Sequence, residues 1–134
     1  NPYYYIIFIL FLPTKKNHLF IILSSFLIGL FIDVSIGTLS TSGPVHALSS
    51  LCLGYFRPKY IQIISVRGSN LNEQSFNNLN FGRIMSYLIF GVLFHHFTLF
   101  TLSGLNLINI LISTSLSSLF TILLLIFSYY IFKK

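Results

Sequence analysis

Residues 18–36 of this chain have the sequence HLFIILSSFLIGLFIDVSI, in which a single acid, Asp33, stands inside an otherwise uncharged run. A run of this length suffices for a helix that crosses a bilayer, which takes about 20 residues. A carboxylate inside hydrocarbon costs a few kcal/mol and normally has a partner or a task. Asp33 is one of only two acids in 134 residues, so the group that it faces is the first question that the sequence raises.

The composition places the whole chain in a membrane. Hydrophobic residues make up 54% of it and charged residues only 7%, whereas about a quarter of an ordinary soluble domain is charged. We expect an all-α, polytopic bundle of transmembrane helices in one domain, residues 1–134, because each apolar segment needs its neighbours. The basic residues fall in short connections and form no folded basic face, which argues against binding of nucleic acid.

Five apolar segments are predicted, at residues 2–12, 18–36, 44–64, 84–102 and 105–132, with a polar loop at residues 65–83. The second, fourth and fifth have ample length for a span, the third is dotted with polar residues, and the first is short. The chain starts at Asn1 without Met or a signal peptide. We therefore expect that one helix precedes it, which gives six helices in the full protein.

The basic residues predict the topology. If all five segments cross, the eight Lys and Arg residues share one face of the membrane: Lys15, Lys16, Arg57, Lys59, Arg67, Arg83, Lys133 and Lys134. The connections on the opposite face, residues 37–43 and 103–104, contain none. Because Lys and Arg accumulate on the cytoplasmic side, we expect a cytoplasmic loop at residues 65–83, a cytoplasmic C-terminus and an external Asn1.

This topology brings four ionisable residues to a similar depth. Asp33, His46 and the pair His95 and His96 come from three segments, and all lie in the outer half of the membrane. We expect a buried polar cluster in which Asp33 pairs with one or more His side chains. Neighbouring His residues on a helix diverge by about 100°, so His95 and His96 do not both face the cluster squarely.

Two functions fit such a cluster. The favoured one is structural, since a pair with Asp33 satisfies the acid and fixes the helix register. The other is a metal or proton site of a transporter. The two adjacent His residues lack the spacing of a metal-binding pair, and the chain has no nucleophile elbow, phosphate loop or Cys pair. We expect no enzyme activity, no cofactor and no bound metal.

Two further patterns are predicted to be structural. Tyr3, Tyr4 and Tyr5 at the start, like Tyr129 and Tyr130 near the end, are interpreted as interfacial anchors in preference to a ligand box. A polar stripe on the last segment is interpreted as a face for helix packing in preference to a substrate path. It contains Asn106, Asn109, Ser113, Thr114, Ser117, Ser118 and Thr121.

An ordered set of short motifs resembles the MreD family of bacterial rod shape-determining membrane proteins, and its Bacteroidetes-type members most closely. The set includes Gly29-Leu30-x-x-Asp33, Thr38, Gly43, His46-Ala47, Tyr55-Phe56-Arg57-Pro58, Arg67-Gly68, His95-His96-Phe97 and Leu99-Phe100, and it starts at Asn1-Pro2-Tyr3. The resemblance covers nearly the whole chain. It marks Gly29, Gly43, Tyr55, Arg57 and Pro58 as family-motif residues.

The resemblance implies a six-helix protein of the bacterial inner membrane, somewhat like the vitamin-binding S-components of energy-coupling transporters. It implies a non-enzymatic scaffold of cell elongation and lateral peptidoglycan synthesis. The implied partners are MreC and, through the complex, the actin-like MreB, the glycosyltransferase RodA and a transpeptidase. The alternative is a small-molecule binding or transport subunit with an outer-facing polar site, which the fold analogy alone does not exclude.

Overall fold

The computed structural model describes residues 3–12, 17–64 and 81–132, and each regular element in these ranges is a helix. The helices are α1 (Tyr5–Phe11), α2 (His18–Ile36), α3 (Thr38–Thr41), α4 (Val45–Ile64), α5 (Phe81–Leu102) and α6 (Leu107–Phe132). The prediction of an all-α chain is therefore confirmed. Several residues used in the sequence argument lie outside the described ranges: Asn1, Lys15, Lys16, Arg67, Lys133, Lys134 and most of the predicted loop 65–83.

Three helices are long and apolar enough to cross a membrane. They are α2, α5 and the part of α6 at Leu107–Phe127, with mean hydropathies of 2.4, 1.5 and 2.3. This confirms the prediction of a membrane protein. Helix α1 has only 7 residues, far fewer than a span needs. Helix α4 contains Arg57, Pro58 and Lys59, so the crossing of residues 2–12 and 44–64 stays a prediction.

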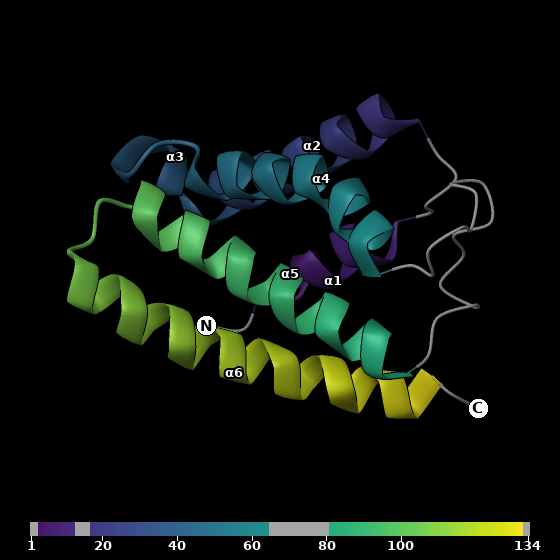
Figure 1. Cartoon of the computed structure of the whole chain (residues 1–134). Coiled ribbons are helices and arrows are strands. Elements are labelled where there is room, and N and C mark those ends of the chain that lie inside the picture. The colour runs from purple at the N-terminus through teal and green to yellow at the C-terminus, as the bar shows by residue number, and fades with distance from the viewer. Residues whose placement is uncertain (1–2, 13–16, 65–80, 133–134) are drawn as a thin grey trace.

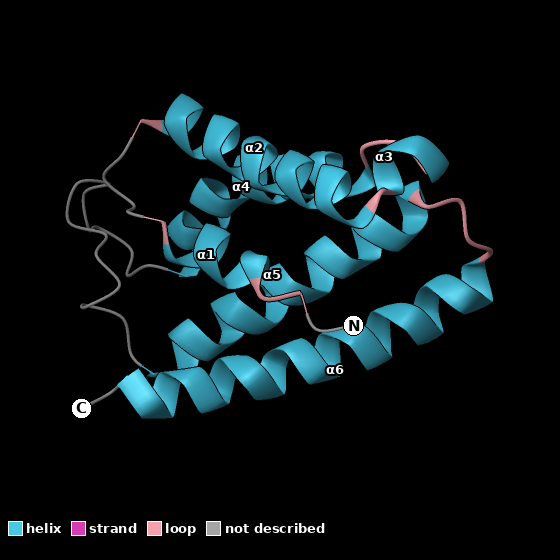
Figure 2. Ribbon diagram, turned by 180° about the vertical axis from the view of Figure 1, so that it is seen from behind, coloured by secondary structure: helices cyan, strands magenta, loops and turns pink. Residues whose placement is uncertain are grey.

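The long helices lie side by side (Figures 1 and 2). Helix α2 packs against α4, α5 packs against both α4 and α6, and α6 lies at the edge of the bundle. The C-terminal ends of α1, α4 and α6 share one end of the bundle with the start of α2 and of α5, whereas α3 and the α5–α6 turn lie at the other end (Figure 1). Arg57, Lys59 and Arg83 belong to the last turns of α4 and the first turn of α5, toward the first end.

Two boundaries differ from the prediction. Helix α5 begins at Phe81, before the predicted start at residue 84, because a helix can continue past the end of an apolar run. The connection between the second and third segments contains α3, which the sequence analysis did not predict. Gly37 and Gly43 flank this short helix with φ angles of 80° and 77°, a backbone conformation that glycine adopts without strain. The motif residue Gly43 is therefore the turn that leads into α4.

Helices α2 and α4 approach closely along a line of small side chains. The residues that α2 buries recur at every fourth position: Ile21, Ser25, Gly29 and Asp33. A Cβ atom on Gly29 would lie 2.6 Å from the Cα atom of Ala47, which is too close for any side chain. Small residues permit such contacts between membrane helices. The motif residue Gly29 thus sets the distance between α2 and α4.

Helix α1 packs one face into the bundle, while Phe8 and Phe11 on its other face are exposed. It contacts α2, α4 and α5. Its residues Ile6, Ile9 and Leu10 are fully buried and belong to a cluster with Leu53 of α4 and Val92 of α5. The short first segment is therefore part of the hydrophobic core.

Candidate functional site

Asp33 is fully buried in the last turn of α2, and its carboxylate caps the start of α4. Oδ1 accepts the backbone N–H of His46 at 3.1 Å, and Oδ2 accepts that of Ala47 at 2.8 Å. The hydroxyl of Thr38 also donates to Oδ1, at 2.7 Å. The first N–H groups of a helix lack partners within it, and the positive end of the helix dipole favours a carboxylate there. Asp33, which belongs to α2, therefore supplies hydrogen-bond acceptors for the first N–H groups of α4.

This geometry corrects one detail of the predicted cluster. The structure brings Asp33 to His46, but the contact goes to the backbone N–H of His46 and not to its ring. The described hydrogen bonds of the carboxylate go to two amides and one hydroxyl. Asp33 thus pairs with the N-terminus of α4. The prediction considered only side chains as partners, so it did not include these backbone N–H groups.

The His side chains gather around Tyr5 of α1 instead. The Tyr5 hydroxyl lies 2.9 Å from Nδ1 of His46 and 3.0 Å from Nε2 of His95. Ser49 Oγ also lies 3.2 Å from Nε2 of His95. One hydroxyl group therefore joins three helices, α1, α4 and α5. The prediction that Tyr5 is an interfacial anchor is wrong, because its hydroxyl points into the bundle.

The hydrogen-bonding groups around His95 indicate which ring nitrogen carries the proton. Nδ1 of His95 is buried and has no hydrogen-bond partner in the described part of the chain. A buried N–H without an acceptor is rarer than a buried acceptor without a donor, so the proton belongs on Nε2. His95 Nε2–H then donates to Tyr5, and Tyr5 donates its proton to Nδ1 of His46. In this arrangement His95, Tyr5 and His46 are all uncharged, and each of the two hydrogen bonds has one donor and one acceptor.

His96 turns away from this chain and contacts α6. Its Nδ1 donates to the carbonyl oxygen of Val92 at 2.8 Å, and its Nε2 lies 3.4 Å from Thr121 Oγ1. The rings of His95 and His96 are inclined by 78°, in line with their adjacent positions on α5. Tyr3 packs between the two groups, with ring centroids 5.4 Å from His46 and 5.3 Å from His96. His96 therefore links α5 to α6.

A second buried network holds the other end of α1. The motif residue Arg57 is 2% exposed. Its Nε donates to the Tyr87 hydroxyl at 2.7 Å, and its Nη2 donates to the carbonyl oxygen of Leu12. The Tyr87 hydroxyl in turn donates to the carbonyl oxygen of Leu10 at 2.9 Å. A cation is favourable at the C-terminal end of a helix, where the last carbonyl groups lack partners.

The other motif residues on α4 have different surroundings. Tyr55 is exposed, and its ring lies 5.1 Å from Nζ of Lys59 and 5.8 Å from the ring of His18. Pro58 lies inside α4 and has no N–H to donate to the preceding turn. The sequence analysis did not identify Tyr87, whose role depends on two carbonyl groups at the end of α1. The sequence does show Tyr87 as a single Tyr within the apolar segment 84–102, which could have indicated a buried hydroxyl that needs a hydrogen-bond partner.

The site is built to hold helices in place. Asp33 caps α4, Tyr5 joins two His rings, and Arg57 with Tyr87 caps α1, so the polar groups serve the fold. No group of three His, Cys, Asp or Glu side chains that suits a metal ion occurs among residues 3–12, 17–64 and 81–132. In comparisons with known proteins, no family model, no curated protein and no solved structure matches this chain.

Proposed function

We propose that this chain is a non-enzymatic membrane scaffold of the machinery that elongates rod-shaped bacteria, as its resemblance to MreD implies. The observation that carries the proposal is the position of Asp33. Its carboxylate is engaged by the first turn of α4 and by Thr38. A transporter or an enzyme would use an intramembrane acid for a substrate or a proton, whereas a scaffold needs it to keep the shape of the bundle.

The proposed topology has five crossings in the bacterial inner membrane with a cytoplasmic C-terminus. The arrangement of the helix ends supports it, because the described basic residues belong to turns near one end of the bundle. Positively charged residues of membrane proteins gather on the cytoplasmic side. In this proposal α1 and α4 cross as part of the bundle, where neighbouring helices compensate for their short length or polar residues.

The partners would bind through outward-facing helix surfaces. Helix α6 lies at the edge of the bundle and exposes a continuous apolar face: Leu107, Ile108, Leu111, Ile112, Leu116, Leu119, Phe120, Leu123 and Phe127. Its polar residues Thr114, Ser118 and Thr121 are buried toward α5. We propose that MreC binds at such a surface and connects the chain to MreB, RodA and a transpeptidase.

Depletion of the protein in its own cell tests the proposal. We expect rod-shaped cells to become round and new wall synthesis, imaged with a fluorescent D-amino acid, to lose its pattern along the side wall. A parallel strain that expresses Asp33→Asn should show lower protein abundance with the same shape defect. Unchanged cell shape after depletion would contradict the scaffold function. Normal abundance of Asp33→Asn with loss of solute uptake would favour the alternative, a binding or transport subunit.

A further inference from the structure

Tyr5, His46 and His95 form a bridge between α1, α4 and α5 that holds a fixed number of protons. With both rings neutral, His95 Nε2–H donates to the Tyr5 oxygen over 3.0 Å, and the Tyr5 hydroxyl donates to His46 Nδ1 over 2.9 Å. An imidazole in water takes up a second proton at about pH 6.5. The bridge therefore contains two groups whose charge changes within the physiological range of pH.

An extra proton does not fit the bridge on either ring. On His95 the open position is Nδ1, which is buried and has no hydrogen-bond partner in the described part of the chain. On His46 it is Nδ1 as well, the atom that accepts the Tyr5 proton, so the bond from Tyr5 is lost. His95 is fully buried and His46 is 4% exposed. A charge on such a ring is unfavourable unless new hydrogen bonds compensate it.

Within the described residues, three other titratable groups face the bridge: Asp33 of α2, Tyr3 of α1 and His96 of α5. Asp33 lies at the backbone of His46, and its described hydrogen bonds serve the start of α4 and Thr38. The ring of His96 lies 5.7 Å from that of His95, so a charge on one disfavours a charge on the other. Helix α6 contributes the uncharged Thr121, which contacts His96. No described acid bonds to the His95 ring.

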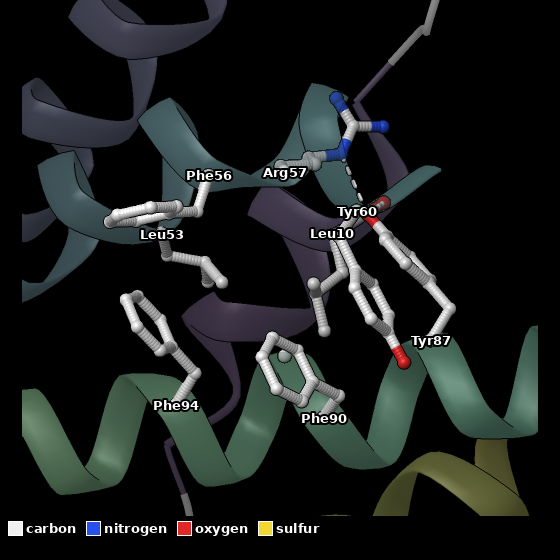
Figure 3. A pocket seen from close by; sticks show the side chains of 9 residues that line it. Leu10, Leu53, Phe56, Arg57, Tyr60, Tyr87, Phe90 and Phe94 are labelled. Atoms are coloured by element: carbon white, nitrogen blue, oxygen red, sulfur yellow. Dashed lines mark hydrogen bonds between the residues drawn. The ribbon is translucent and has the colours of Figure 1, made fainter. Parts of the chain in front are cut away.

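The other end of α1 is held by groups that do not change their charge near neutral pH. Figure 3 shows Arg57 of α4 pointing toward Tyr87 of α5, to which it donates over 2.7 Å. Arg57 also donates to the carbonyl oxygen of Leu12, and Tyr87 donates to that of Leu10. Arg stays protonated and Tyr stays neutral where imidazole titrates. Acidification therefore acts on the start of α1 and leaves its end in place.

We propose that the bridge is an acid-sensitive latch, in which proton uptake by His46 and His95 releases the start of α1 from α4 and α5. Each ring gains one proton from water at Nδ1, and these two N–H bonds are the covalent bonds that form. The docked state binds fewer protons than the released state, so docking is favoured at neutral pH and is lost as the pH falls below about 6.5. Two protons make the response steep, up to about 100-fold in the docking equilibrium per pH unit. The latch is a property of the bundle and does not depend on the proposed scaffold function.

The test is NMR of the full chain in detergent micelles with 15N-labelled His, from about pH 8 to about pH 4. The chain has four His residues, and substitution of His18 or His96 identifies those two rings, so the remaining signals belong to the bridge. We expect His46 and His95 to gain their protons in one step with a Hill coefficient of about 2. Nuclear Overhauser contacts between Tyr5 and His95 should disappear in the same step. The exposed His18 is the internal control and should titrate with a Hill coefficient of about 1.

Tyr5→Phe should raise the pH at which α1 is released, because it removes the hydroxyl that both His rings share. When release takes up two protons, a tenfold loss in the docking equilibrium raises the midpoint by about half a pH unit. Tyr4→Phe removes the same atom from an exposed side chain and should leave the midpoint unchanged.

Three outcomes would overturn the latch. Separate titrations of His46 and His95, each with a Hill coefficient of about 1, would show that α1 does not couple the two rings. Tyr5–His95 contacts that persist after both rings are charged would show that the bundle accommodates the charges. Rings that stay neutral down to about pH 4 would show that the bridge does not respond to acid. The parent chain gives all three results, so they stand even if Tyr5→Phe fails to fold. Unchanged cell shape after depletion would reject the scaffold function and leave this titration unaffected.

Discussion

The carboxylate of Asp33 accepts the backbone N–H of Ala47 at 2.8 Å, although the two residues are 14 positions apart and belong to different helices. This bond ties the last turn of α2 to the first turn of α4. A carboxylate at a helix N-terminus contributes about 0.3–2 kcal/mol, with the larger values at partly buried sites. The stability of this corner of the bundle therefore depends on one acid.

Asp33→Asn should destabilise the bundle. Asn keeps the size of the side chain but removes the charge and replaces one acceptor oxygen with a donor that faces a backbone N–H. We expect the free energy of unfolding, measured by titration with a denaturing detergent, to fall by about 1–3 kcal/mol. Ser35→Ala on the exposed side of the same helix is the control and should change it by less than about 0.5 kcal/mol. Similar values for the two variants would refute the capping role.

Tyr5→Phe should loosen α1 without changing its hydrophobic contacts. The substitution removes the hydroxyl that joins His46 and His95, so buried ring nitrogens lose a partner. We expect a loss of about 1–3 kcal/mol in the free energy of unfolding. Tyr4→Phe removes the same atom from a side chain that is 57% exposed and should have little effect. The role of the bridge is disproved if both variants unfold like the parent chain.

Arg57→Lys should also be destabilising, although it conserves the charge. Arg57 donates through two different nitrogens to Tyr87 and to the Leu12 carbonyl, a geometry that the single ammonium group of Lys does not reproduce. We expect a loss of about 1–3 kcal/mol. A double-mutant cycle with Tyr87→Phe should give a coupling energy of at least about 0.5 kcal/mol. Strict additivity would mean that the two residues act independently.

Gly29→Ala and Gly82→Ala should have opposite effects. A Cβ atom at Gly29 would collide with the backbone of α4, so the two helices must move apart. We expect a loss of more than about 2 kcal/mol at this position, toward the upper end for a single substitution. Nothing lies within 4 Å of a Cβ atom on Gly82, and alanine there should stabilise α5 by up to about 1 kcal/mol. A neutral Gly29→Ala would show that α2 and α4 do not need their close contact.

The sequence predicted the long helices well because their apolar runs are continuous. Residues 18–36 form α2 with the predicted bounds, since Lys15, Lys16 and Asn17 precede the run and Gly37 ends it. The polar stripe of the last segment was interpreted as a packing face, and Ser117 and Ser118 are indeed buried. Asn106 and Asn109 of the same stripe are exposed, because they stand at the start of α6. Periodicity predicts which residues share a face, but not how far the neighbouring helix extends.

The partners of the polar residues were harder to predict. The sequence marked Asp33 as a residue with a buried partner, but the partner is a pair of backbone amides, which every helix start provides and no sequence motif distinguishes. Tyr5 was interpreted as an anchor because its position at the chain start suggested an interface. In the structure Tyr5 is the first residue of the short helix α1, and its hydroxyl contacts His95 inside the bundle. Such contacts depend on tertiary packing of segments far apart in the sequence.

The two polar networks that fasten α1 have a consequence for biosynthesis. Tyr5 bonds to His95, which follows it by 90 positions, and Tyr87 bonds to Leu10 across 77 positions. At a synthesis rate of about 5–20 residues per second, α1 waits on the order of 5–20 s before α5 has been made. Helix α1 therefore completes the hydrogen bonds at both of its ends only after α5 has been made, although α1 itself is synthesised long before α5.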